Sequence, residues 1–154
     1  MPQDCPFCSP NVEKACFAAS ENFRAIYNIA PILPGHSLII PKLHIERFLD
    51  LPDEHLAELM TFSKKVMIGM QGVFNTDGFD FTIQDGEAAG QTVAHTHAHI
   101  IPRYKNDLPE PGDWYPTLKS AENEIIDSLK RPRHSDEEMH QIISELSNML
   151  KACL

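Results

Sequence analysis

The order of apolar and polar residues predicts short strands in the first two thirds of the chain. A hairpin is favoured near the start, because a polar turn, Ser20 to Asn22, separates two short apolar segments. Prolines interrupt the pattern before a third strand, and a fourth segment alternates between apolar and polar positions. These four predicted strands are residues 14–18, 24–28, 37–40 and 79–83. A loop with two glycines then leads to a fifth strand, which is expected to be an antiparallel neighbour of the fourth.

Two longer segments repeat apolar residues at the spacing of an amphipathic helix. The first begins at Pro52, which suits a first helical turn, with Asp53 and Glu54 beside the positive end of the helix. Its apolar stripe is Leu56, Leu59, Met60, Val66, Met67, Met70, Val73 and Phe74. The second follows a capping box formed by Ser135 and Glu138. Between them, residues 105–116 are expected to be irregular and 118–130 to form a helix.

Length and charge narrow the class of protein. The 154 residues suffice for one domain with a core, and a hydrophobic content of 42% favours a globular chain. The 22 acidic residues exceed the 13 basic ones, so a general binder of nucleic-acid backbones is not expected. The chain has no run of about 18 apolar residues, so no membrane span is predicted, and its first residues lack a signal pattern. We therefore expect a soluble, cytoplasmic protein that does not bind a membrane.

Three histidines at alternate positions, His95, His97 and His99, are the main chemical feature of the chain. In a strand these rings share one face, while the intervening residues face the core. One neutral imidazole could then attack a phosphoryl group while its neighbours donate hydrogen bonds. Satisfied core histidines and a metal pair are the alternatives. A metal site that used all three is disfavoured, because the outer two would lie about 13 Å apart along a strand.

A disulfide framework is not expected for the four cysteines, because the chain has this much predicted core and no export signal. Cys5 and Cys8 form a Cys-x-x-Cys pair, which could be redox-active, structural or incidental. Cys16 and Cys153 are interpreted as ordinary residues, one in a predicted strand and one near the end of the chain.

Several motifs resemble those of the histidine triad superfamily. The segment 95–101 matches the His-φ-His-φ-His-φ-φ pattern, where φ is apolar, with Thr96 the one imperfect position. Pro34-Gly35-His36 is similar to a second shared motif of that superfamily. Segments 84–86 and 89–93 resemble more specifically the fragile histidine triad branch, which hydrolyses dinucleoside polyphosphates such as diadenosine triphosphate. The resemblance covers roughly residues 14–104.

The resemblance implies an α+β fold, with a five-stranded antiparallel sheet, a long amphipathic helix and a C-terminal helix. It also implies a homodimer. We expect a single domain over residues 1–154, with a core at about 14–104 and a C-terminal extension at 105–154.

Roles for individual residues follow from the same resemblance. His97 would attack the α-phosphorus to form an adenylyl-histidine, His99 would hold a phosphate oxygen, and His95 would stand at the edge of the catalytic row. A water molecule would then release AMP. His36 would orient the three histidines. The residues expected to bind a purine nucleotide or dinucleoside polyphosphate are Asn28, Gln84, Gly90, Gln91, Thr92, Val93 and His99.

The resemblance also implies a structural zinc site. In some members of the superfamily a Cys-x-x-Cys pair joins a histidine from a Pro-x-x-His segment and the first histidine of the triad. Cys5, Cys8, His44 and His95 occupy the corresponding positions here. Two thiolates and two imidazoles form a closed tetrahedral site. The fragile branch usually lacks these ligands, so the chain combines features of two branches.

Three alternative functions remain open at this point. A nucleoside phosphoramidase would cleave AMP–amine bonds with the same triad, although segments 84–86 and 89–93 argue against it. A dinucleoside tetraphosphate phosphorylase would use phosphate in place of water. A nucleotide-binding or zinc-stabilised interaction protein without catalysis has no need of a nucleophile such as His97. The products of each reaction differ and would separate these functions.

Overall fold

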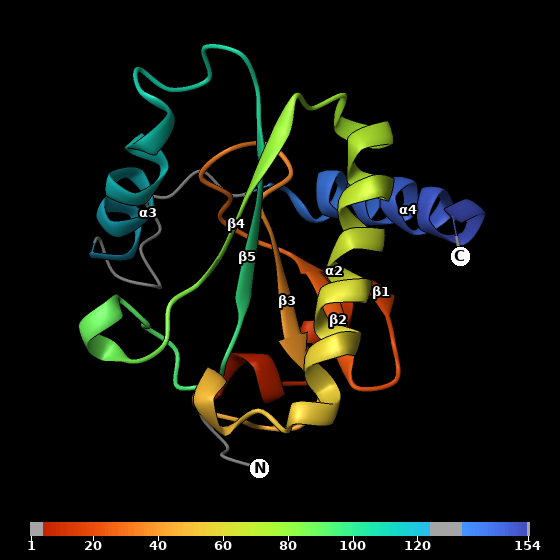
Figure 1. Cartoon of the computed structure of the whole chain (residues 1–154). Helices are drawn as coiled ribbons and strands as arrows, with labels where there is room; N and C mark the ends of the chain where they lie inside the picture. The colour runs from red at the N-terminus through yellow and green to blue at the C-terminus, as the bar shows by residue number, and fades with distance from the viewer. Residues whose placement is uncertain (1–4, 124–133, 154) are drawn as a thin grey trace.

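Five antiparallel strands form the centre of the molecule, in a computed structural model that describes residues 5–123 and 134–153 (Figure 1). The strands are β1 (Cys16–Ala19), β2 (Phe23–Tyr27), β3 (Ser37–Pro41), β4 (Gly78–Ile83) and β5 (Ala98–Arg103). Their order across the sheet is β1-β2-β3-β5-β4, and every neighbouring pair is antiparallel. The predicted α+β class and five-stranded sheet are confirmed. β5 therefore lies inside the sheet, between β3 and β4.

Within the described residues, four α-helices and four short 3-10 helices accompany the sheet. The α-helices are α1 (Val12–Ala15), α2 (Asp53–Phe74), α3 (Trp114–Asn123) and α4 (Asp136–Cys153). The 3-10 helices are η1 (Pro6–Cys8), η2 (Phe48–Asp50), η3 (Glu87–Ala89) and η4 (Pro111–Asp113). In the described part of the chain, no helix has both the length and the apolar composition needed to cross a bilayer.

One face of the sheet is covered by α2, against which α4 packs (Figure 1). Val66 and Met70 of α2 are fully buried, as the apolar stripe predicted. The two helices approach closely at Gly69, where an added Cβ would lie 2.7 Å from a methyl group of Leu150. Met60 differs from the prediction, because 57% of its surface is exposed. Leu59 and Phe62, on either side of it, are buried, so Met60 lies at the border of the apolar stripe rather than within it.

The opposite face of the sheet is partly covered by the N-terminal segment. Val12 and Ala15 of α1 pack on Ile26, Leu38 and Ile40 of β2 and β3. Burial of this second cluster holds residues 5–15 close to the end of the sheet where β5 begins (Figure 1). The N-terminal cysteines are thereby brought near the histidines, although about 90 residues separate them in sequence.

Some predicted element boundaries differ from those in the structure. The first half of predicted strand 14–18 is helical, since α1 ends at Ala15 and β1 begins at Cys16. The helix predicted over 118–130 begins earlier, at Trp114, and its predicted residues 124–130 lie outside the described residues. Pro116 does not prevent this start, because the first N–H groups of a helix have no intrahelical partner. The predicted capping box is confirmed, with Glu138 N–H donating to Ser135 Oγ at 3.2 Å.

The histidine strand also begins later than predicted. β5 starts at Ala98, so His95 and His97 lie in the segment that leads into it. The N–H of His95 donates to the carbonyl of Val93, and that of Thr96 donates to the carbonyl of Ile45 in the loop before α2. These bonds replace the ladder bonds of a sheet, and the chain bends there. The three rings are consequently not evenly spaced along one strand.

Candidate functional site

The three triad histidines are buried where β5 begins. The exposed fractions of the His95, His97 and His99 side chains are 0%, 5% and 3%. The rings of His97 and His99 are neighbours, with centroids 4.9 Å apart. Ala98 and Ile100 point the other way, into the core beneath α2, as the alternation predicted. The structure therefore keeps two of the rings together on one side of the chain.

His97 is held in the orientation of a nucleophile. Its Nδ1–H donates to the backbone carbonyl of His95 at 2.8 Å, a tautomer assigned from this bond. Nε2 is then the unprotonated nitrogen, and its lone pair is the one available for attack. Burial lowers the pKa of His97 below its ordinary value, so the neutral form predominates at neutral pH.

His99 is held in the complementary state, that of a donor. The N–H of Ile32 and the amide of Asn28 both donate to His36 Nδ1, each at 3.4 Å. His36 Nε2 therefore carries a hydrogen and donates it to His99 Nδ1 at 2.9 Å. His99 Nε2 must then be protonated. Burial and the neighbouring His36 hold the pKa of His99 well below its ordinary value, so this ring donates while neutral.

Two buried polar atoms at this site lack a hydrogen-bond partner. Among the described residues only three buried side-chain N or O atoms are in that condition, and two of them are His99 Nε2 and Gln84 Oε1. An unpaired buried polar group costs about 1–3 kcal/mol, so native structures rarely retain one without a reason. A bound ligand with polar oxygens and hydroxyls would satisfy both atoms.

The loop between β4 and β5 contains two glycines with positive φ angles. Gly86 has φ 90° and Gly90 has φ 95°. A Cβ on Gly90 would lie 2.9 Å from Gln84 Nε2 and 3.4 Å from the hydroxyl of Tyr115. Tyr115 belongs to α3, in the C-terminal extension that the sequence placed outside the core. The loop, Gln84 and the start of α3 therefore lie together.

Gln91 and Asn28, both predicted to bind substrate, have internal partners. Gln91 Oε1 accepts from Gly86 N–H at 2.7 Å, and its Nε2 donates to the carbonyls of Glu46 and Val93 at 2.7 and 2.9 Å. Asn28 Oδ1 accepts from Ala30 N–H at 3.0 Å. Both side chains thus shape the loops around the site. Thr92 is exposed and Val93 is half-buried, beside these bonds.

Residues 44–48 anchor the site, and sequence reasoning assigned a role only to His44. Beyond the Ile45 and Glu46 carbonyls already described, Arg47 makes a bidentate pair with Asp85, at 3.1 and 2.9 Å. Asp85 also accepts from Phe48 N–H at 2.6 Å, and these donors lower its pKa. Opposite charges at Arg47 and Asp85 were visible in the sequence. Their pairing was not, because 38 residues separate them.

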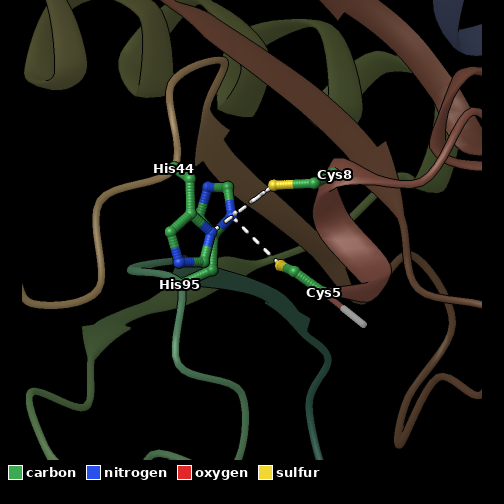
Figure 2. A group of neighbouring side chains, drawn as sticks. All are labelled: Cys5, Cys8, His44 and His95. Atoms are coloured by element: carbon green, nitrogen blue, oxygen red, sulfur yellow. Dashed lines mark hydrogen bonds between the residues drawn. The ribbon is translucent and has the colours of Figure 1, made fainter. Parts of the chain in front are cut away.

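The four predicted metal ligands come together, as Figure 2 shows. The ligand atoms of Cys5, Cys8, His44 and His95 all lie within 4.8 Å of one another. His95 Nδ1 lies 3.4 Å from Cys5 Sγ and 3.6 Å from Cys8 Sγ, and His44 Nδ1 lies 3.4 Å from Cys8 Sγ. The sulfur–nitrogen edge of a tetrahedral zinc site is about 3.6 Å, given its usual bond lengths. The donor set and its spacing therefore fit such an ion.

Each ligating ring has a partner at its second nitrogen, Nε2, as metal-binding histidines usually do. His95 Nε2 donates to the carbonyl of Pro41 at 3.1 Å, so its Nδ1 is unprotonated and directed at the sulfurs. A carboxylate oxygen of Glu46 lies 3.7 Å from His44 Nε2. Burial lowers the pKa of His95 to about 4, which keeps the ring neutral, as a ligand must be. The four residues form a group that could hold a metal ion.

Comparisons with known proteins agree with this fold and show the family of the chain. A family model described as HIT domain matches residues 9–106, and the chain therefore belongs to the HIT domain family. It is 41% identical over 130 residues to a bis(5'-adenosyl)-triphosphatase of Dictyostelium discoideum, covering 84% of this chain and 81% of that protein. It is 38% identical over 125 residues to an asymmetrical bis(5'-nucleosyl)-tetraphosphatase of Schizosaccharomyces pombe, covering 81% and 69%.

A solved structure extends the likeness to the whole chain. The crystal structure of a zinc-bound histidine triad family protein from Mycobacterium smegmatis superposes with a TM-score of 0.70 at 27% identity, covering 97% of each chain. The resemblance to the histidine triad superfamily, and to its fragile branch, is thus confirmed by the family match and these relatives.

Proposed function

We propose that this protein hydrolyses dinucleoside polyphosphates, such as diadenosine triphosphate, at the α-phosphate. The observation that carries the proposal is the pair of opposite tautomers, with a lone pair on His97 Nε2 beside a hydrogen on His99 Nε2. Nucleophile and donor are thereby prepared next to each other before substrate arrives. The names of the relatives from Dictyostelium discoideum and Schizosaccharomyces pombe support the same class of substrate.

In the proposed mechanism His97 Nε2 attacks the α-phosphorus, and the bond to the bridging oxygen breaks. The nucleoside di- or triphosphate leaves with the electrons of that bond, and AMP remains on His97. The carbonyl of His95 stabilises the positive ring through its bond to Nδ1–H, while His99 Nε2–H donates to a non-bridging oxygen. Water then displaces His97 from phosphorus, releasing AMP and one proton and regenerating the neutral ring.

Substrate contacts are proposed for the residues around this pair. Gln84 would bind the phosphate chain or leaving group, a role that its buried Oε1 without a partner supports. Gly90, Thr92 and Val93 would line the approach to the histidines, and Gln91 shapes that loop from within. Asn28 would bind the ribose.

Product analysis tests the proposal directly. The protein is incubated with diadenosine triphosphate, with diadenosine tetraphosphate, and with a phosphoramidate in which AMP is joined to a lysine-like amine. The products are resolved by chromatography. Hydrolysis of the triphosphate is expected to yield AMP and ADP. Cleavage of the phosphoramidate alone, to AMP and free amine, would indicate the phosphoramidase. Production of ADP and ATP from the tetraphosphate, only when phosphate is present, would indicate phosphorolysis. No product from any substrate would contradict the catalytic proposal.

We also propose that the ion held by Cys5, Cys8, His44 and His95 is zinc with a structural role. Two thiolates and two imidazoles leave no open position for substrate in a tetrahedral site. When bound, zinc would supply a fixed cross-link between the N-terminal segment and the segment before β5. Elemental analysis of the purified protein is expected to give about one zinc per chain. Protein without bound metal, even after purification with added zinc, would contradict this assignment.

We further propose that the protein is a homodimer, that each chain is a single domain, and that it is located in the cytoplasm. β4 lies at the edge of the sheet and pairs on one side with β5, so its other side offers backbone groups to a second copy. The net charge of −9 argues against a nucleic-acid partner. Light scattering is expected to give twice the chain mass, and the chain mass alone would contradict the dimer. Fractionation of cells would test the location.

A further inference from the structure

We infer that the group of four metal ligands described above, here called the metal tetrad, positions the nucleophile. Its ligand His95 and Phe7, one of the two residues between its cysteines, both contact His97. The metal is then a requirement for catalysis as well as for folding of the N-terminal segment. This inference rests on the proposed function, in which His97 attacks phosphorus.

The first link runs through the backbone of His95. Both nitrogens of the His95 ring have partners. Nδ1 lies beside the sulfurs of Cys5 and Cys8, and Nε2–H donates to the Pro41 carbonyl. The carbonyl of His95 is the acceptor that holds His97 Nδ1–H at 2.8 Å. Residues 95 and 97 lie outside the ladder of β5, so the sheet does not fix them. A metal bond to the ring of His95 would anchor the carbonyl that sets the tautomer of His97.

The second link is the side chain of Phe7. This residue lies in η1, between the two cysteine ligands, and its ring meets both histidine rings edge to face. The ring centroids are 5.3 Å from His97 and 5.6 Å from His95. The backbone of η1 makes a bond within itself, from Cys8 N–H to the Cys5 carbonyl. Such a short turn has little stability alone, so the two cysteine ligands would hold Phe7 in place.

Packing of Phe7 on one side of His97 restricts rotation of the imidazole. A nucleophilic ring that rocks about its bonds presents its lone pair to phosphorus only part of the time, and small misplacements cost much of the rate. The hydrogen bond to His95 fixes the direction of Nε2, and Phe7 supports the plane of the ring. Both constraints would be weakened together by loss of the metal, because Cys5, Cys8 and His95 share it.

Three variants separate the metal from the aromatic contact. Cys8→Ser removes one ligand. Phe7→Ala keeps all four ligands and removes the ring contact, and Phe7→Leu restores apolar bulk. Cys16→Ser is the matched control, since Cys16 is a half-buried cysteine outside the tetrad whose bond to the Ala18 carbonyl serine can keep. Metal content, circular dichroism, nucleotide affinity, kcat and KM are measured for each. The ¹⁵N signals of the His97 ring report its tautomer in the same samples.

Cys8→Ser is expected to lose the metal and to mix the two tautomers of His97, with kcat falling about 10- to 100-fold and KM changing less. Phe7→Ala is expected to keep the metal and lose about two- to tenfold in kcat, with Phe7→Leu in between. Cys16→Ser should match the wild type. A folded, metal-free Cys8→Ser protein with unchanged kcat and His97 signals would overturn the inference. An inactive wild type would instead contradict the proposed function, and the tautomer measurement would still test the metal link.

Discussion

At the scale of single residues, burial keeps the imidazole of His97 in the neutral form that a nucleophile requires. Removal from water lowers the pKa of both His97 and His99, so neither ring is protonated at neutral pH. Hydrogen bonds then decide which nitrogen of each neutral ring carries the hydrogen. The backbone carbonyl of His95 decides it for His97, and His36 decides it for His99. Two identical side chains thereby take opposite roles.

The first prediction concerns the nucleophile. His97→Asn is expected to abolish turnover, because an amide nitrogen has no free lone pair with which to attack phosphorus. Binding should persist, since His99 and Gln84 remain. Calorimetry with a non-hydrolysable dinucleotide and product assays check both parts. Turnover comparable to that of the wild type would exclude His97 as the nucleophile.

The second prediction concerns His36. Replacement by leucine removes the donor to His99 Nδ1, so His99 is no longer held with its hydrogen on Nε2. We expect kcat to fall about tenfold, the cost of roughly one hydrogen bond. His140→Asn, at an exposed position on α4, is the control and should leave kcat unchanged. An unchanged kcat in folded His36→Leu protein would mean that the tautomer of His99 does not matter.

At the scale of elements, the short loop at residues 44–48 joins the parts of the site. His44 belongs to the metal tetrad, and the carbonyl of Ile45 bonds to Thr96 just before the nucleophile. Glu46 and Arg47 then hold the loop between β4 and β5, through Gln91 and Asp85. Movement of this loop would therefore disturb the metal ligands and the approach to the histidines together.

A third prediction tests the loop between β4 and β5. Gly90→Ala places a Cβ 2.9 Å from Gln84 Nε2 and requires a side chain at φ 95°, which costs about 1 kcal/mol or more. We expect kcat/KM to fall about tenfold as Gln84 or the loop moves. Gly112→Ala is the matched control, because its Cβ would meet nothing within 4 Å. Equal kcat/KM values for the two variants would contradict a role for this close approach.

At the scale of the whole molecule, Arg103 ties the end of β5 to the segment that follows it. Its guanidinium makes a bidentate pair with Asp107, at 2.8 Å for each bond, and also binds Asp80 at 2.6 Å. The hydrogen bonds from Arg103, supported by the backbone N–H of Tyr104, lower the pKa of Asp107 to about 2. The Asp107 side chain is 8% exposed, so solvent screens the pair only weakly.

A fourth prediction follows for stability against pH. The folded-state pKa of Asp107 lies below its ordinary value of 3.8, so its stabilisation is complete above about 3.8 and disappears as the pH falls through 2. Asp107→Asn is expected to lower the free energy of unfolding by about 2 kcal/mol at neutral pH. Urea unfolding of both proteins from neutral pH downward is the measurement. A difference that persists below pH 2 would show that charge is not its source.

Much of the fold could be predicted because its signals are local. The stripe that buries Val66 and Met70, and the capping box at Ser135, depend on residues a few positions apart. The late start of β5 could not be predicted, since it depends on the bond from Thr96 to Ile45, in a distant loop. The helical start at Trp114 was missed because Pro116 suggests irregular chain unless it falls in a first turn.

The sequence by itself determined which side chains are available for chemistry: alternating histidines, a cysteine pair and a glycine-containing loop are patterns written in consecutive residues. Only the tertiary structure decided how they act. In the folded protein, His97 and His99 take opposite tautomers, Arg47 pairs with Asp85, and the ring of Phe7 packs on the ring of His97. Except for the bond between His95 and His97, these contacts join segments far apart in the chain. Burial of two apolar clusters on the two faces of the sheet brings those segments together, and no local pattern encodes that proximity.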